Sequence, residues 1–247
     1  MRRFYAAPDN FQNDEVTLGL DETRHLRDVL RLNEGEQIQI FDGDGKEFLC
    51  EIERIEKRRT QIKVIREIAP KSAESNLYLT LAVALLKGEK FDLVVQKSAE
   101  LGVSKIIPLV TKRCDVKIRD AKDAAKRLER WQRIALEAAK QSGRARLLKI
   151  ETPANFADFT ENSTAQISSG EKFILFAERN GESFSQIEAN GKITAIIGAE
   201  GGWEDAEIET AREKGFQVVT FKGRVLRAET AAIAIAAVIQ HRFGDFN

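Results

Sequence analysis

The chain has 247 residues, 43% of them hydrophobic, which is enough apolar material for one large core or two smaller ones and excludes a disordered chain. It carries 39 Lys and Arg against 39 Asp and Glu, and this balance argues against a protein that coats nucleic acid nonspecifically. The charge is nevertheless segregated: residues 111–149 hold 13 basic and 5 acidic side chains, whereas residues 150–215 hold 5 and 13. A basic block of this size is typical of a surface that contacts phosphates, and a solvated helix face is the alternative.

Neither a metal site nor a membrane segment is expected. Cys50 and Cys114 lie 64 positions apart, and neither has a second Cys or a His at metal-ligand spacing. The stretch Met1–Pro8 is not followed by the apolar run of a signal peptide, and no apolar run approaches the ~20 residues that cross a membrane. We therefore expect a cytoplasmic protein with reduced thiols.

The first part of the chain reads as mostly β. Short runs with alternating polarity predict strands at residues 37–41, 48–52 and 61–65. Between the first two, Asp42–Lys46 contains Asp-Gly and is followed by no helix, so it predicts a hairpin turn rather than a phosphate-binding loop. The exception is Asp21–Arg31, whose apolar residues have helical spacing and predict a short amphipathic helix.

After residue 70 the pattern changes. The polar stretch Ile68–Asn76 contains a proline and marks a domain boundary, which gives domains 1–70 and 71–247. Apolar runs at 77–86, 105–110, 173–177, 193–197 and 217–221 then alternate with helical patterns at 91–101, 122–141, 204–214 and 228–242. This alternation predicts an α/β domain with a largely parallel sheet. The last helix is apolar on nearly every face, so it is either central in the core or buried partly against a second subunit.

Two glycine loops each follow an apolar run and precede a helical pattern. The first is Gly198–Trp203 and the second is Lys222–Ala231. Because glycine has no Cβ, a ligand can approach the backbone N–H and C=O groups of such turns, and the two loops could hold one ligand between them. The acids Glu204, Asp205 and Glu207 after the first loop would repel an anion, which favours a neutral adenine or a cationic sulfonium. Neither Gly-x-Gly-x-x-Gly nor a Walker A sequence occurs.

Both loops, in this order, resemble those of the RsmE family, the ribosomal RNA uridine N3-methyltransferases of the SPOUT class. Similar stretches extend over nearly the whole chain: Met1–Phe4, His25–Arg31, Lys97–Val103 with Pro108 and Arg113, Arg130-Trp131, and Glu137–Arg144. Several independent motifs in the right order are much more specific than any one of them.

The resemblance implies a small PUA-like β-barrel domain, residues 1–70, ahead of a SPOUT-type α/β domain, residues 71–247, whose C-terminal chain threads a loop to form a trefoil knot. It also implies a homodimer that uses S-adenosylmethionine to methylate N3 of a specific uridine in the 16S ribosomal RNA of the small subunit, a step of ribosome biogenesis. One wall of the cofactor pocket would consist of Gly198, Glu200, Gly201 and Gly202. The other would consist of Phe221, Gly223, Leu226, Arg227, Glu229 and Thr230.

Methyl transfer to N3 requires loss of the imide proton, which is mostly present at neutral pH, so a general base is expected. The candidate bases are Glu200 and Glu229, and Arg227 could stabilise the developing anion at O2 or O4. The alternative for Glu229 is an acid that only complements a helix dipole, and for Arg227 a structural ion pair.

N3 lies on the Watson–Crick edge, so the target base must be unpaired or extruded, and binding must come mainly from the flanking RNA. The expected RNA contacts are Arg2, Arg3, His25, Arg27 and Arg31 in the small domain and Arg113, Arg130, Arg133, Lys140 and Arg144 in the larger one. For any one of them a solvated surface is the alternative. Within the same basic helix, the stripe that includes Trp131 and Ala135 predicts core packing rather than base stacking.

The chain departs from the family's usual residues at Arg24, Ala199, Lys222 and Glu204. Ala199 loosens the backbone of the first loop, and Lys222 puts a charge near the cofactor wall, so we expect altered cofactor affinity or orientation. These departures motivate one rival hypothesis, a non-catalytic RNA-binding assembly factor. A second rival is a SPOUT methyltransferase with another acceptor, such as transfer RNA or a ribose 2′-OH.

Overall fold

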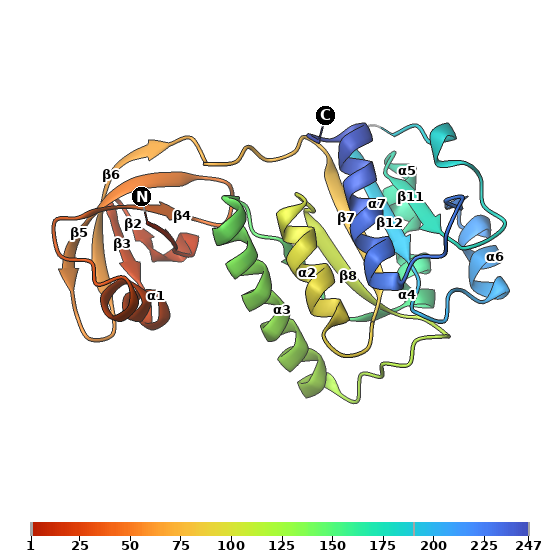
Figure 1. Ribbon diagram of the computed structural model, residues 1–247, viewed down its shortest axis with the longest axis horizontal. Coiled ribbons are helices and arrows are strands. Elements are labelled where there is room, and N and C mark those ends of the chain that lie inside the picture. The colour runs from red at the N-terminus through yellow and green to blue at the C-terminus, as the bar shows by residue number, and fades with distance from the viewer. Residues whose placement is uncertain (1, 190, 247) are drawn as a thin grey trace. The chain divides into compact units, whose positions relative to one another are not determined.

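The computed structural model describes residues 2–189 and 191–246, and the chain divides into two compact units (Figure 1). The first unit comprises Met1–Glu74 and Ala139–Leu147, and the second comprises Ser75–Ala138 and Leu148–Asn247. The segment Ala139–Leu147 therefore packs with the first unit although it lies far along the chain.

A six-stranded sheet with the order β1-β4-β5-β6-β3-β2 forms the first unit. Its strands are β1 Arg3–Tyr5, β2 Phe11–Gln12, β3 Glu15–Leu18, β4 Gln37–Phe41, β5 Glu47–Ile55 and β6 Thr60–Ile68. All neighbours are antiparallel except β1 and β4. The β5–β6 register shifts between Leu49 and Cys50 and between Ile52 and Arg54, and such irregularities increase twist and bend a sheet. The result is a curled, PUA-like half-barrel (Figure 1).

The expected elements of this unit are confirmed. The three strands correspond to β4, β5 and β6, and between β4 and β5 one carboxylate oxygen of Asp42 accepts the backbone N–H groups of Asp44, Gly45 and Lys46, as in a hairpin turn. The expected helix is α1 Leu20–Arg24, which continues into one π-helical turn, η2 His25–Val29. A 3₁₀ turn, η1 Pro8–Asn10, precedes β2.

The second unit is built on a parallel sheet with the order β10-β8-β7-β12-β11-β13, with β9 beside β8. Its strands are β7 Tyr78–Ala84, β8 Lys105–Val110, β9 Lys149–Ile150, β10 Ala154–Asn155, β11 Lys172–Phe176, β12 Lys192–Ile197 and β13 Gln217–Val219. Its helices are α2 Lys90–Glu100, α3 Ala121–Ser142 as far as Ala138, α4 Phe156–Asn162, α5 Thr164–Ser168, the 3₁₀ turn η3 Phe184–Gln186, α6 Asp205–Glu213 and α7 Ala228–Phe243; the last turn of α3 belongs to the first unit. Each run and helix expected after residue 70 is present.

Helices cover both faces of this sheet because its strands are apolar on both sides. On one face, Leu79 and Leu81 of β7 join a core with α2, α3 and α7 (Figure 1). On the other face, Ala82 joins a second core with Phe173, Trp203 and residues of α4 and α6. The apolar helix α7 packs against α2, β7 and β12, and its residues Ala232, Ile235, Ala236 and Ile239 are buried within this unit.

The chain at Val218–Thr220 is hydrogen-bonded on both edges. Val219 C=O accepts the N–H of Ala177 at 2.9 Å, and on the opposite edge Val218 C=O accepts the N–H of Glu182 at 2.8 Å. Thr220 N–H then donates to Glu182 C=O at 3.1 Å. The loop 177–182 thus wraps the end of β13 before the chain returns to α7 at the centre of the sheet. In a trefoil knot the chain passes through a loop of this kind, and the knot that the resemblance implies stays a prediction.

Candidate cofactor site

A cavity of about 600 Å³ opens in the second unit where the carboxyl ends of β11, β12 and β13 meet. Ligands of α/β sheets bind at this edge, and this volume suits a small molecule. The cavity is lined by Lys90, Phe176–Glu178, Ile197–Trp203, Phe221, Gly223–Ala228, Ala231 and Ile235. The two glycine loops therefore form its two walls.

The glycines of the first loop are required by their neighbours. A Cβ at Gly198 would lie 3.0 Å from the indole nitrogen of Trp203, which donates to Phe176 C=O at 2.9 Å. Gly202 has a φ of +69°, and a Cβ there would lie 2.7 Å from the Glu178 carboxylate. At Gly201 a Cβ would lie 2.9 Å from the Arg113 Cβ. The loop is thus packed closely against Trp203, Glu178 and Arg113, and side chains at these three positions would not fit.

The second loop is open to solvent. Gly223 has a φ of +115°, which favours glycine, and the side chain of Val225 is 89% exposed. Arg227 lies just before α7 and is exposed. Among residues 2–189 and 191–246, its guanidinium has no ion-pair or hydrogen-bond partner. The alternative role expected for Arg227, a structural ion pair, is therefore not found among the described residues.

A cluster of one ammonium and two carboxylates lies at the cavity. Lys90 Nζ donates to Glu200 Oε1 at 2.8 Å and lies 3.9 Å from Glu229 Oε2, a buried atom with no hydrogen-bond partner in the described part of the chain. Burial alone would raise the pKa of Glu200, but the hydrogen bonds from Lys90 and from the backbone N–H of Lys87 outweigh it and lower the pKa below its ordinary value. Glu200 is therefore ionised at neutral pH.

Eight of the ten expected cofactor residues line the cavity, and two do not. Glu229 lies behind Lys90, and Thr230 is exposed on α7. Sequence reasoning missed Lys90, although it follows β7 at the same carboxyl edge of the sheet and this position could have indicated it. Among the departures, Ala199 is buried and accepts the N–H of Gly202 at 2.9 Å, whereas Lys222 is exposed.

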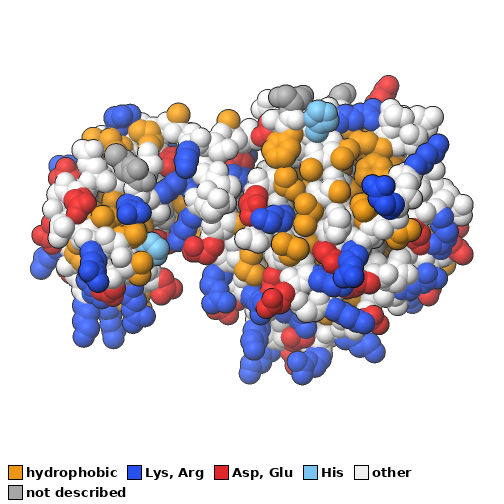
Figure 2. Space-filling view, viewed as in Figure 1, with side chains coloured by type: hydrophobic (Ala, Val, Ile, Leu, Met, Phe, Trp, Pro, Cys, Tyr) orange, Lys and Arg blue, Asp and Glu red, His pale blue; other side chains and the backbone are white. Residues whose placement is uncertain are grey.

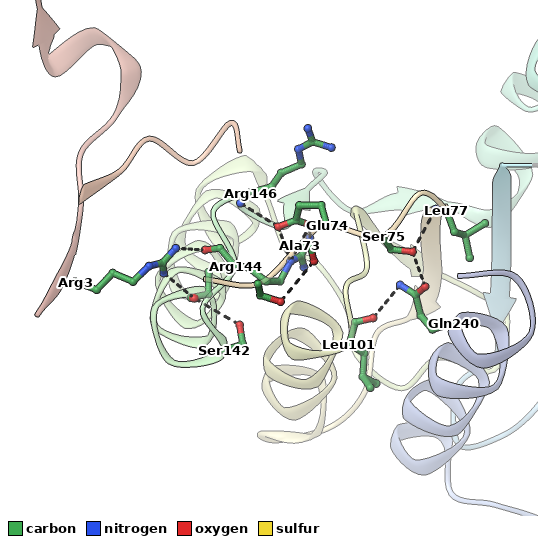
Figure 3. A network of polar contacts seen from close by, with 12 residues as sticks. Arg3, Ala73, Glu74, Ser75, Leu77, Leu101, Ser142, Arg144, Arg146 and Gln240 are labelled. Atoms are coloured by element: carbon green, nitrogen blue, oxygen red, sulfur yellow. Dashed lines mark hydrogen bonds and ion pairs between the residues drawn. The ribbon is translucent and has the colours of Figure 1, made fainter. Parts of the chain in front are cut away.

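The expected RNA contacts divide into two groups. Arg2, His25, Arg31, Arg113, Arg130 and Arg133 are exposed, and Arg27 is half-buried. Lys and Arg side chains also gather around the N-terminal end of α3 (Figure 2). By contrast, Arg3 and Arg144 are buried in ion pairs with Glu47 and Glu74, and Lys140 pairs with Glu22 (Figure 3 shows Arg3 and Arg144). As expected, Trp131 and Ala135 lie in the core.

Among the described residues, no helix is both long and apolar enough to cross a membrane. In the same part of the chain, no group of three or more His, Cys, Asp or Glu residues is placed to hold a metal ion.

Comparison with known proteins defines the class of protein first. Residues 73–240 match the family model described as an RNA methyltransferase domain, and residues 19–65 match the one described as an RNA methyltransferase PUA domain. The chain is therefore an RNA methyltransferase with a PUA domain.

Its relatives then identify the family. The chain is 33% identical to the ribosomal RNA small subunit methyltransferase E of Synechocystis, over 96% of this chain and 76% of that one, and 31% identical to that of Bacillus subtilis, over 98% and 97%. The structure of the Neisseria gonorrhoeae methyltransferase E, bound to S-adenosyl methionine, is similar with a TM-score of 0.88 and 35% identity over 100% of both chains. The chain belongs to the RsmE family.

Proposed function

We propose that this protein transfers a methyl group from S-adenosylmethionine to N3 of a specific uridine in the 16S ribosomal RNA of the small ribosomal subunit. The observation that carries the proposal is the cavity between the two glycine loops, which lies at the ligand-binding edge of the sheet and is lined by the residues that the sequence indicated. The Neisseria gonorrhoeae relative, bound to S-adenosyl methionine, supports the choice of cofactor.

The residues of the cavity fit this cofactor. Phe221 and Ile235 offer apolar surface for an adenine, and the backbone of Gly198, Gly201 and Gly202 offers hydrogen-bonding groups without side chains in the way. The ionised carboxylate of Glu200 suits a cationic sulfonium better than a phosphate. When bound, the cofactor supplies an electrophilic methyl group.

The protein's own task is then to position the uridine and remove its N3 proton. Glu200 is the candidate base that lines the cavity; it is ionised, and its lowered pKa makes it a weaker base than an ordinary glutamate. Glu229 does not line the cavity; it attracts the ammonium of Lys90, and Lys90 in turn holds the Glu200 carboxylate in place. Arg227 lines the cavity, its guanidinium has no partner among the described residues, and it stabilises the negative charge that develops on the uracil oxygens.

A homodimer, acting in the cytoplasm on the RNA or the assembled small subunit, completes the proposal. Its support is the outer side of α7, where Val238 is exposed and Ile233, Ala234 and Ala237 are half-buried. An apolar helix side of this kind is stabilised when a second copy covers it.

The test is a calorimetric titration with S-adenosylmethionine, followed by mass spectrometry of nucleosides from treated 16S RNA. We expect the wild type to bind, and Ala231→Phe, which places a ring in the cavity, to lose affinity by more than tenfold. The matched control Ala165→Phe lies on α5, where Ala165 is exposed and does not line the cavity, and it should bind normally. Failure of the folded wild type to bind, with RNA absent and present, would favour the assembly-factor hypothesis. Cofactor binding with a different methylated nucleoside would favour another acceptor.

A further inference from the structure

Lys90 occupies an unfavourable place for a cation. It is the first residue of α2, where the positive end of the helix dipole opposes an ammonium group. The two acids nearest to it in sequence, Glu89 and Asp92, pair with Arg130 instead. The carboxylates that face Lys90 come from distant parts of the chain, Glu200 from the first glycine loop and Glu229 from the first turn of α7.

These two carboxylates compete for one ammonium. Lys90 Nζ lies 2.8 Å from Glu200 Oε1, at hydrogen-bond distance, and 3.9 Å from Glu229 Oε2, which is too long for a hydrogen bond. The Glu229 side chain is 12% exposed and that of Glu200 is 26% exposed, so Glu229 has less access to water and more need of a partner. The difference of about 1 Å between the two distances is within the reach of the flexible four-carbon stem of a lysine.

Protonation of Glu200 changes the charge balance of this cluster. In the structure one positive charge faces two negative charges, and its hydrogen bond to Glu200 opposes protonation of that carboxylate. Once Glu200 holds a proton, an ammonium that stayed beside it would have lost its counter-ion. Glu229 supplies that counter-ion, and the pair of Lys90 with Glu229 then leaves the cluster neutral.

We propose that Lys90 is a movable ammonium, which pairs with Glu200 in the free enzyme and passes to Glu229 as Glu200 accepts the N3 proton. The proton leaves N3 for a Glu200 oxygen, the electron pair of the N–H bond stays on N3, and Glu200 releases the proton to water when Lys90 returns. Lys90 and Glu229 are positioning residues in this step, because neither takes the proton itself. The inference rests on the proposed function, and it explains how a glutamate that is a weak base while paired acts as one in the reaction.

The other polar groups around Glu200 fit this division of roles. Lys87 donates its backbone N–H to Glu200 at 3.4 Å, while its ammonium pairs with Asp115 at 2.7 Å. Cys114, which interacts electrostatically with Glu200, has a pKa raised by burial, so its thiol is uncharged at neutral pH. Lys90 is thus the cation whose movement changes the charge that Glu200 faces, and the backbone of Lys87 keeps the carboxylate in place meanwhile.

The first test is a crystal structure of full-length Glu200→Gln without RNA or cofactor. Glutamine has the shape of a protonated glutamate and no charge, so Lys90 Nζ should lie within about 3.2 Å of a Glu229 oxygen in this variant. The matched control Glu213→Gln removes a carboxylate from an exposed position of α6, and its Lys90 should stay on Glu200. A Lys90 that remains on residue 200 in Glu200→Gln, with Glu229 unpaired, would overturn the proposal.

The second test is the pH profile of kcat for methylation of 16S RNA, with the fold of each variant checked by circular dichroism. In Glu229→Gln the ammonium has no second carboxylate and stays on Glu200, so kcat at pH 7 should fall by about 10–100-fold with little change in KM for RNA. The acid limb of the profile should move to lower pH, because Glu200 then keeps its lowered pKa in the complex.

Adding Lys90→Met to Glu229→Gln removes the ammonium from Glu200 and should restore kcat by about tenfold over the single variant. If Glu229 were only a structural residue, the double variant would be no faster than the single one, and that result would overturn the proposal, as would an unchanged kcat in Glu229→Gln. A wild type that does not methylate uridine N3, together with a displaced Lys90 in the Glu200→Gln crystals, would count against the proposed function alone.

Discussion

Arg3 gives the sharpest test of how this chain uses its cations. Its side chain is 8% exposed, and it donates to both carboxylate oxygens of Glu47, at 2.8 and 3.2 Å, while Glu47 is 1% exposed. The guanidinium also donates to the carbonyls of Ala139 and Arg144 and lies 4.0 Å from the ring centre of Phe41 (Figure 3 shows the contact with Arg144). We predict that Arg3 is a structural residue and not an RNA contact.

The magnitude follows from what Arg3→Met leaves behind. The Glu47 carboxylate would stay buried and, among residues 2–189 and 191–246, would keep one partner, the backbone N–H of Lys71 at 3.3 Å. Removing one member of a buried ion pair costs about 3–5 kcal/mol, because the other charge is left desolvated without compensation. This cost is a large part of a typical unfolding free energy of roughly 5–15 kcal/mol. The double variant Arg3→Met/Glu47→Leu removes the orphaned charge as well, and should recover much of the loss.

The assay is urea denaturation followed by circular dichroism, with the RNA affinity of each folded variant measured alongside. The control is Arg2→Met, which removes the same charge from the exposed neighbour and should change the unfolding free energy by less than about 0.5 kcal/mol. If Arg3→Met cost less than about 1 kcal/mol and yet weakened RNA binding, the reasoning from burial would be refuted and the sequence-based assignment of Arg3 to RNA would stand.

Three further predictions concern the site and the thiols. Lys90→Met removes the cation that lowers the pKa of Glu200, so this pKa rises. As the pH is lowered, Glu200 of the variant then becomes protonated earlier, and calorimetry should show that cofactor binding is lost at a higher pH than in the wild type. Arg227→Met should lower kcat by about 10²–10³-fold, while Lys222→Met, with the same charge loss in the same loop, should change it little; equal effects would contradict the role of Arg227. Burial raises the pKa of Cys50 to about 12, so this thiol should stay unreactive toward iodoacetamide at pH 8 until the protein unfolds, which mass spectrometry can check.

Local patterns in the sequence were sufficient for the elements but not for their arrangement. The run 77–86 predicted a strand because every residue from Leu79 to Ala84 is apolar or can be buried, and β7 is indeed covered on both faces. Nothing in that run indicates that its neighbours are β8 and β12, since pairing depends on contacts between residues far apart in the chain. For the same reason the wrapping of β13 by the loop 177–182 has no local signal.

The site residues were likewise predictable only where a local sequence pattern marked them. The glycines at 198, 201 and 202 were recognisable because a glycine-rich turn between a strand and a helix has a distinct local pattern. Lys90 was not recognisable, because its contact with Glu200 joins residues 110 positions apart. Arg3 and Arg144 were assigned to RNA because a sequence shows the charge of an arginine but not its burial, which here is decided by Glu47 and Glu74.

The wrapped end of β13 has a consequence for how the protein is made. Loop 177–182 is synthesised before Val218–Thr220, and everything that forms the second wall of the cavity, together with α7, follows those residues in the chain. The nascent polypeptide can therefore form its first unit and most of the parallel sheet while it has no complete cofactor site. Docking α7 onto α2 and β7 joins segments more than a hundred residues apart, and contacts of such long range form slowly. Assembly of the cofactor site is thus the late step of biosynthesis, and the last helix to be placed is the one that completes it.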